Sequence, residues 1–406
     1  MLIVKTPEEV FELIEERFRD ACGEEEVILT DAVNRILAHD VVAEENVPDF
    51  NRSTVDGYAV RAEDTFGCSE SIPAILTISG EILMGGEAGE KLNVGECRII
   101  PTGGAVPEGS DSIVMVEHTE SYGDGTVGIF KPAAPGMNMV YKGDDVHPGK
   151  VVMKAGRKIK GPDIGALAAL GYSNLTVKKK PVVGIISTGD ELVDITETPL
   201  LGQTRDVNSY TLNSFCVQAG AEPMNYGIIR DEEELLDAAL TRALAECDMV
   251  LISGGSSVGT KDATYRIISS KGEMLLHGIA VKPGKPTIMG ICDGKPVIGL
   301  PGHPAASYYV SEIFVKEVIA RLQGRTLNRH AMRAVLSSTV GANHGRTQYT
   351  GVVLREEKGV LYADPIHSKS GLISSLSQAD GYFCIERDSE GVSAGDEIEV
   401  FQFDID

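Results

Sequence analysis

The pattern of hydrophobic and polar residues changes along the chain, and its clearest alternation lies between residues 181 and 326. Short runs that are almost entirely apolar alternate there with segments whose apolar residues recur at helical spacing. Fully apolar runs are typical of strands that are buried on both faces of a parallel sheet. The alternation therefore predicts an α/β fold with a doubly wound parallel sheet. Predicted strands lie at 181–186, 249–252 and 296–300, and a further predicted strand ends at residue 229. The predicted helices lie at 208–219, 231–243 and 304–323.

Capping residues indicate where several helices begin. Thr6 and Glu9 flank Pro7 in the pattern of a capping box, which predicts a first helix beginning at residue 7. Asn208 is expected to cap the helix that follows it, and Asp231 is expected to cap the next one. A capping side chain satisfies free N–H groups of the first turn, so these positions set the predicted helix starts.

The rest of the chain has shorter apolar runs separated by Gly, Pro and Asp. Residues 46–145 are expected to form a β-rich module, and residues 327–406 a small β-barrel or sandwich. A second helix is expected to begin near residues 29–31, and a short helix is expected from residue 161 to Gly171. The chain is therefore predicted to contain several domains.

Composition fits a globular protein and excludes a disordered, collagen-like or coiled-coil protein. The 406 residues include 37 Lys and Arg against 60 Asp and Glu, a net charge of −23. Nucleic acids and anionic membranes bind clustered positive charge, so general binding to either is not expected. The seven cysteines are scattered without a C-x-x-C pair, which argues against a disulfide framework or a zinc ribbon. With no signal peptide or membrane span expected, the sequence predicts a cytoplasmic protein.

The predicted strands end in polar, glycine-rich segments. In open parallel sheets, ligands bind beyond the carboxyl ends of the strands. Ser and Gly expose backbone N–H groups there, and the next helix N-terminus favours an anion. Each segment alone also fits an ordinary turn, but four of them on one sheet edge predict a phosphate or oxyanion site. The segments are Ser187–Glu191, Arg230 with Asp231, the turn containing Ser253, Gly254, Gly255 and Ser256, and Pro301–Pro304.

Acidic side chains gather at the same predicted edge. Asp190, Glu191, Asp231 and Asp262 each follow a predicted strand. Carboxylates beside phosphate-binding turns suit Mg²⁺, which prefers one or two carboxylates together with phosphate oxygens and water. We therefore expect these residues to hold Mg²⁺ against a phosphate or pyrophosphate. The alternatives are that Asp231 only caps a helix and that Asp190 and Glu191 lie in a solvated turn.

Lys282 and Lys285 lie in the segment Val281–Pro286, whose two prolines restrict the backbone. In a chain this acidic, two lysines held three residues apart suggest binding of a tetrahedral oxyanion. The alternative is a surface loop whose lysines are solvated. A Walker A loop is absent, because Gly284-Lys285 is followed by proline rather than by Ser or Thr. His303 is expected to be structural rather than catalytic.

Six motifs together resemble a known family. They are STVDGYAV (53–60), PTGGAVPEGSD (101–111), GIISTGDEL (184–192), SGGSSVG (253–259), VKPGKP (281–286) and LPGHP (300–304). In this order they are similar to the motifs of the molybdopterin molybdenumtransferases, the family of MoeA and the gephyrin E-domain. The match runs nearly end to end. It implies a discontinuous linking domain at 1–45 and 146–180, an inserted β-rich module at 46–145, a molybdopterin-binding α/β domain at 181–326 and a C-terminal β-barrel at 327–406.

The resemblance also implies a reaction and a set of site residues. The reaction is Mg²⁺-dependent insertion of molybdate into adenylylated molybdopterin with release of AMP, in a homodimer whose cleft is shared between subunits. Substrate contacts are implied for Lys282, Lys285, Arg346, Ser370, Pro301 and Pro304. Functional positions are implied for Asp56, Thr102 and Asp145 in the inserted module, and for Glu191, Asp231 and Asp262 around the pyrophosphate and Mg²⁺.

Two positions depart from the family pattern. Some relatives carry a further lysine where this chain has Gly278, so the oxyanion pocket is expected to hold one positive charge fewer. His303 replaces the asparagine that is common in the L-P-G-N-P form.

Two other functions stay open at this point: a scaffold that binds a pterin phosphate without turnover, and a Mg²⁺-dependent nucleotide pyrophosphatase on a similar α/β core. The residues do not distinguish molybdate from tungstate.

Overall fold

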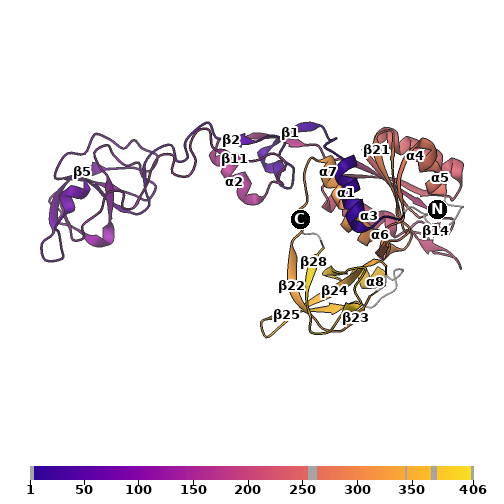
Figure 1. Cartoon of the computed structure of the whole chain (residues 1–406). Coiled ribbons are helices and arrows are strands. Elements are labelled where there is room, and N and C mark those ends of the chain that lie inside the picture. Colours follow the sequence, from indigo (N-terminus) through magenta and orange to yellow (C-terminus); the bar gives the residue numbers. More distant parts are fainter. Residues whose placement is uncertain (1–3, 255–262, 343–344, 367–372, 404–406) are drawn as a thin grey trace.

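The structure is a computed structural model that describes residues 4–254, 263–342, 345–366 and 373–403. Figure 1 shows a β-rich module at one end of an elongated molecule and an α/β domain at the other end, with a small linking part between them. A β-barrel lies beside the α/β domain. In the described ranges, no helix is both long enough and apolar enough to cross a membrane.

A six-stranded sheet forms the centre of the α/β domain, in the order β16-β13-β17-β21-β20-β18. The first four strands are parallel, as the sequence predicts: β13 (Val182–Thr188), β16 (Glu222–Ile229), β17 (Met249–Ser253) and β21 (Lys295–Leu300). The last two are antiparallel and were not predicted: β18 (Gly272–His277) and β20 (Ile288–Cys292). The turn between β20 and β21 has positive φ at both Asp293 (50°) and Gly294 (77°), which an Asp-Gly hairpin turn requires.

Helices cover both faces of this sheet. One face packs on α1, α3 and the α6–α7 segment, around Phe215 and Phe314. The other face packs on α4 and α5, around Leu240 and Ile267. The long helix predicted for 304–323 is present, with one π-helical turn in its middle. The helices are α1 (Pro7–Arg17), α3 (Asn208–Gln218), α4 (Glu233–Glu246), α5 (Ala263–Lys271), α6 (Pro304–Val310), η4 (Ser311–Val315) and α7 (Lys316–Leu322).

The predicted caps are only partly correct. Thr6 and Glu9 form the expected capping box at the start of α1. Asn208 does not cap α3: it lies inside the helix, and the carboxylate of Asp206 accepts the free N–H of Ser209 instead. Asp231 does not cap α4, which begins two residues later and has no side-chain cap. Both side chains are therefore available for other contacts.

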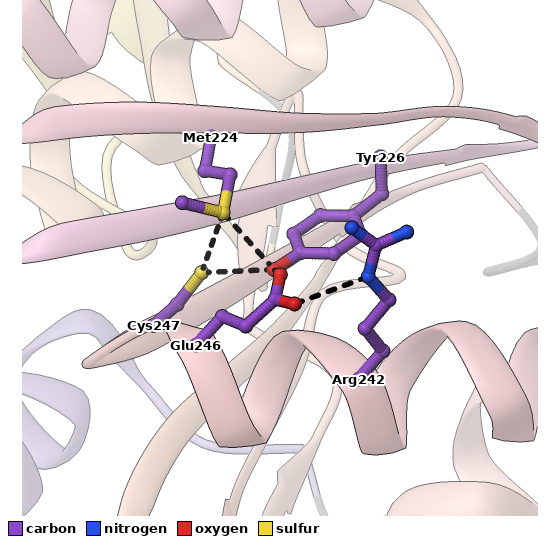
Figure 2. Close-up of polar contacts among 5 residues, drawn as sticks. All are labelled: Met224, Tyr226, Arg242, Glu246 and Cys247. Atoms are coloured by element: carbon purple, nitrogen blue, oxygen red, sulfur yellow. Dashed lines mark hydrogen bonds and ion pairs between the residues drawn. The ribbon is translucent and has the colours of Figure 1, made fainter.

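The outer strand β16 is fastened to α4 by a small cluster of polar and sulfur-containing side chains (Figure 2). The hydroxyl of Tyr226 on β16 donates to Glu246 Oε2 at 2.6 Å, and Arg242 Nε donates to the other oxygen of that carboxylate at 3.2 Å. The sulfur atoms of Met224 and Cys247 lie 3.2 and 3.4 Å from the same hydroxyl oxygen. These contacts hold the edge of the sheet against its covering helix.

The C-terminal region is a closed five-stranded barrel, which is one of the two architectures that the sequence pattern predicts and the one that the family resemblance implies. Closure follows from β24, which pairs with β25 on one side and with β26 on the other. Phe383 and Val352 are buried in its interior. The strands are β22 (Ala331–Leu336), β24 (Thr347–Glu357), β25 (Val360–Pro365), β26 (Gly381–Ile385) and β28 (Glu397–Gln402), with the small elements β23 (Val340–Gly341), α8 (Ile373–Leu376) and β27 (Gly391–Val392) beside them.

The linking part joins segments that are distant in sequence. Leu37 and Ala32 share one core with Met153, Leu167 and Val177. The helix predicted near residues 29–31 is only a single 3-10 turn, because the chain straightens after it and Leu37 forms a β-bridge with Val177. The elements are β1 (Glu24–Ile28), η1 (Leu29–Ala32), β2 (Val41–Val42), β11 (Val151–Met153), α2 (Gly161–Ala169) and β12 (Asn174–Lys178).

The module at 46–145 is rich in β-structure, as predicted. Its main sheet has the order β7-β4-β6-β5-β9-β8, and its core contains Leu76, Cys97 and Val127. Its elements are β3 (Arg52–Ser53), β4 (Gly57–Val60), η2 (Ala62–Thr65), β5 (Ala74–Glu81), β6 (Glu96–Ile100), β7 (Ser112–Met115), η3 (Val116–His118), β8 (Thr119–Ser121), β9 (Thr126–Ile129) and β10 (Met139–Val140).

Candidate functional site

A cavity of about 700 Å³ lies where the α/β domain meets the barrel. Its lining residues come from the loop before β20, from the turn after β21, from α6 and from barrel strand β24. Cationic residues, tyrosines and small residues line it together. The lining includes Lys282, Lys285, Pro301, His303, Tyr309, Arg346, Gln348, Tyr349, Thr350 and Gly351.

The two lysines of the K-P-G-K segment both line this cavity. Val281 and Lys282 form the short strand β19 (Val281–Lys282), which pairs in parallel with Thr347 and Gln348 of the barrel. Gly284 follows with φ +115°, and a β-carbon there would lie 2.5 Å from Val310 Cγ2. Glycine is thus required both by the backbone conformation and by the close approach of α6. The loop is therefore shaped by contacts with both domains.

Arg346 precedes β24 and lines the same cavity as the two lysines. The structure therefore brings together the three predicted cationic substrate contacts, from two segments that are distant in the chain. Gly278 lies on the same loop, and its carbonyl oxygen accepts the N–H of Lys5 at 3.1 Å. This contact ties the N-terminal segment to the loop. No side chain from position 278 can add a further charge to the cavity.

The turn after β21 forms another wall of the cavity. Pro301 and His303 line it, whereas Pro304 is the first residue of α6 and does not line the cavity. Pro at this position suits a helix start, because its missing N–H has no partner there in any case. The turn is held from behind: Gly302 O accepts a hydrogen bond from Asn208 Nδ2 at 2.9 Å.

Asn208 joins the ends of neighbouring strands of the parallel sheet. Besides Gly302 O after β21, its Nδ2 donates to Ser253 Oγ at the end of β17, at 2.7 Å. Gly254 follows with φ +101°, and a β-carbon there would lie 2.0 Å from the carbonyl oxygen of Thr188 on β13. The sequence pattern predicts Asn208 only as a helix cap, so this bridging contact was missed. Asp206, two residues earlier, was the signal that another residue could serve as the cap.

The predicted carboxylates that the structure describes, Glu191 and Asp231, lie with Asp190 at the same sheet edge. Asp190 Oδ1 accepts the backbone N–H of Asp231 at 3.3 Å, which brings the ends of β13 and β16 together. The carboxylate of Glu191 folds back over Gly189, where a β-carbon would lie 2.7 Å from Oε2. The carboxylates of Asp190, Glu191 and Asp231 offer oxygen ligands, the type that Mg²⁺ prefers. Two short strands follow this turn, β14 (Leu192–Val193) and β15 (Thr204–Arg205).

Part of the predicted site lies outside the described residues. These positions are Gly255, Ser256, Asp262 and Ser370. Within the described ranges, no three His, Cys, Asp or Glu side chains are close enough to hold a metal ion. The proposed magnesium ligands Glu191 and Asp231 are among the described residues, and the third ligand, Asp262, is not.

The inserted module brings two of its predicted residues into direct contact. The backbone N–H and the hydroxyl of Thr102 both donate to Asp56 Oδ1, at 2.6 and 2.9 Å. The hydrogen bond from the backbone N–H has the larger effect on Asp56, and together with the one from the hydroxyl it lowers the pKa of this carboxyl. Asp145 is held by its backbone, whose N–H donates to Val47 O at 3.1 Å. None of these three predicted residues lines the cavity of the same chain, and Figure 1 shows their module at the far end of the molecule.

Three family models match consecutive parts of the chain. The model described as "MoeA N-terminal region (domain I and II)" matches residues 5–171. The "Probable molybdopterin binding domain" matches residues 184–321. The "MoeA C-terminal region (domain IV)" matches residues 333–403. Together the matches include both walls of the cavity and the inserted module.

Named relatives are similar over nearly the whole chain. A molybdopterin biosynthesis protein of Methanocaldococcus jannaschii is 34% identical, over 97% of this chain and 95% of its own length. The molybdopterin molybdenumtransferase of Bacillus subtilis is 31% identical, over 95% and 93%. A crystal structure of a molybdopterin biosynthesis MoeA protein from Pyrococcus horikoshii superposes with a TM-score of 0.88 at 31% identity, over 98% of this chain and 100% of that chain.

Proposed function

Because the chain belongs to the MoeA family, we propose that it is a molybdopterin molybdenumtransferase of molybdenum cofactor biosynthesis, which inserts molybdate into adenylylated molybdopterin and releases AMP. The relatives of Bacillus subtilis and Haemophilus influenzae, each about 30% identical over more than 90% of this chain, carry that enzyme name. The substrates, the metal and the assembly are part of the proposal, and each is argued separately below.

One observation carries the proposal: Lys282, Lys285 and Arg346 line a single cavity in a protein whose net charge is −23. A protein this acidic repels dianions in general, so a local group of three cationic residues indicates a site for an anion. Molybdate is a tetrahedral dianion. The cavity lies at a domain junction, where cationic residues from two domains face one space and together attract an anion.

The cationic side chains and the strand ends have separate roles in the proposed reaction. Lys282, Lys285 and Arg346 bind and orient molybdate, so that it meets the dithiolene sulfur atoms of the pterin at short range. The strand-end turns at Ser253 and Gly302 bind the phosphate-bearing part of the substrate through backbone N–H groups. Neither role requires a covalent intermediate with the protein.

The carboxylates at the sheet edge suit a magnesium ion. Glu191, Asp231 and Asp262 would hold Mg²⁺, since one or two carboxylates with phosphate oxygens and water form its usual shell. The ion would neutralise the phosphoanhydride and stabilise AMP as it leaves. The contact between Asp190 Oδ1 and the N–H of Asp231 supports this assignment, because it holds two of the acidic turns together.

The inserted module would act on the cavity of a second copy. Asp56 and Thr102 form one hydrogen-bonded unit, yet they lie in a module remote from the cavity of their own chain. A homodimer in which each module reaches the partner's cavity would bring this unit and Asp145 to the substrate.

AMP release tests the proposal directly. Purified protein is supplied with adenylylated molybdopterin, Mg²⁺ and molybdate, and AMP is measured over time. We expect release that depends on both molybdate and Mg²⁺. Release that is equally fast without molybdate, together with cleavage of simple dinucleotides, would instead favour a pyrophosphatase. Tight binding of the pterin with no turnover would favour a scaffold.

A further inference from the structure

Tyr309 is a buried residue of the cavity that is not among the site residues predicted from the sequence. It is 7% exposed and lies on α6, and it lines the cavity together with Lys282, Lys285 and Arg346. Its ring is packed edge-on against Tyr382, with centroids 5.9 Å apart, and it also contacts Phe403. These aromatic contacts fix the direction of the side chain, so its hydroxyl has a defined position.

The barrel leaves room for that hydroxyl at one glycine. Gly351 on β24 also lines the cavity, and a β-carbon on it would lie 2.5 Å from the Tyr309 hydroxyl oxygen. The backbone at Gly351 does not have a positive φ, so its conformation does not require glycine. The space above Gly351 is therefore needed for the hydroxyl of Tyr309, which crosses from the α/β domain to the barrel.

The hydroxyl is a neutral donor in a cationic cavity. Burial raises the pKa of Tyr309 well above its ordinary value, so the group keeps its proton at physiological pH. Among the described residues that line the cavity there is no Asp or Glu to accept its hydrogen bond. A ligand that accepts hydrogen bonds from every side, as an oxyanion does, would supply the acceptor.

We propose that Tyr309 is a further substrate-binding residue, whose hydroxyl donates a hydrogen bond to an oxygen of the bound oxyanion. The inference rests on the proposed function, and it adds a neutral, directional contact to the three charged ones. The lysine ammonium groups attract any anion, whereas a hydroxyl fixed by aromatic packing favours one position of the oxygen atoms. Tyr309 thus helps to orient molybdate rather than only to concentrate it.

Tyr309→Phe tests the hydroxyl alone, because the ring and its packing are kept. We expect the KM for molybdate in AMP release to rise about tenfold, which corresponds to about 1.4 kcal/mol. Binding of sodium molybdate alone, measured by calorimetry, should weaken by a similar factor. The KM for adenylylated molybdopterin should stay unchanged. Gly351→Ala should act in the same direction, since its methyl group displaces the hydroxyl, and should have a smaller effect in the Tyr309→Phe background.

Tyr382→Phe is the matched control. Tyr382 belongs to the same aromatic cluster and is 4% exposed, but it does not line this cavity. The Tyr382→Phe substitution should therefore leave molybdate binding unchanged. A Tyr309→Phe variant that binds molybdate as tightly as the wild type overturns the inference, and so does a rise confined to the KM of the pterin substrate. Wild-type protein that neither binds molybdate nor releases AMP contradicts the proposed function itself.

Discussion

Lys282 and Gln348 are direct partners in a parallel strand pair that joins the α/β domain to the barrel. Through this pair, the loop that carries both lysines becomes an extra strand beside barrel strand β24. Arg346 lies just before the same strand, so one short ladder sets the spacing of the three cationic residues. The positive charge of the cavity therefore depends on the docking of two domains, rather than on one flexible loop.

Removal of either lysine should strongly reduce activity. For Lys282→Ala or Lys285→Ala we expect molybdate-dependent AMP release to fall at least about 100-fold, the scale of losing one preorganised electrostatic contact. Lys154→Ala, which removes an exposed lysine outside the cavity, is the control and should keep the wild-type rate. Full activity in both cavity variants would show that the oxyanion binds elsewhere.

Asn208 should act as a positioning residue. Asn208→Ala removes the hydrogen bonds to Ser253 Oγ and Gly302 O, and should lower the free energy of unfolding by about 1–3 kcal/mol. Because both strand-end turns lose their tie, AMP release should fall about tenfold or more, with a higher KM for the pterin substrate. Urea unfolding and steady-state kinetics measure the two effects.

Asn225→Ala offers a matched comparison for that variant. Asn225 Oδ1 accepts the N–H of Gly227 at 2.8 Å within strand β16 itself, and this hydrogen bond joins no separate elements. Its loss should change the unfolding free energy by only about 0.5 kcal/mol, as is usual for surface substitutions. Equal kinetic effects of the two alanine variants would contradict the positioning role of Asn208.

The fold was predictable where the pattern was local. Fully apolar runs revealed β13, β17 and β21, and the capping box of Thr6 and Glu9 revealed the start of α1. The antiparallel strands β18 and β20 were missed, although the Asp293-Gly294 turn is a hairpin signal. Their apolar runs are short, and periodicity alone does not separate a parallel strand from an antiparallel one.

The types of residue in the candidate site were predictable from the sequence, but the way in which they come together was not. Two lysines between prolines in an acidic chain indicated an oxyanion site, and the structure places both beside one cavity. The pairing of Lys282 with Gln348 depends on how two domains dock, which no local pattern records. Tyr309 was missed for a similar reason, because its significance comes from the space above Gly351 on another domain.

Asp163 should make the stability of the linking part depend on pH. Burial alone would raise the pKa of this carboxyl, but hydrogen bonds from Arg157 (2.7 and 3.0 Å) and from Lys160 N (2.9 Å) outweigh it and lower the pKa. A carboxyl whose pKa is lower in the folded state stabilises the protein above its unfolded pKa of about 3.9. That stabilisation is lost as the pH falls through the lower, folded-state pKa.

Asp163→Asn isolates this contribution. At pH 7 the variant should unfold more readily than the wild type, by about 1–2 kcal/mol, since Arg157 is half exposed and the pair is partly screened. Urea titrations between about pH 7 and pH 3 should show the difference shrinking toward acid pH. A difference that stays constant with pH would mean that the carboxylate charge contributes nothing.

A heterodimer made from two damaged chains should test whether the inserted module acts on a second copy. One chain carries Asp56→Asn and the other Lys282→Ala, and two different affinity tags allow purification of the mixed dimer. If the module of each chain completes the partner's cavity, one cleft receives both changes and the other receives none. The mixed dimer should then show about half of the wild-type AMP release.

Both parent homodimers provide the baseline, because each has a damaged residue in every cleft and should release AMP at least about 100-fold more slowly than the wild type. Recovery of activity only in the mixed dimer requires that Asp56 and Lys282 come from different chains. If the two residues acted within one chain, both clefts would stay damaged and the mixed dimer would be as slow as its parents. The hydrogen-bonded pair of Asp56 and Thr102, remote from the cavity of its own chain, favours recovery.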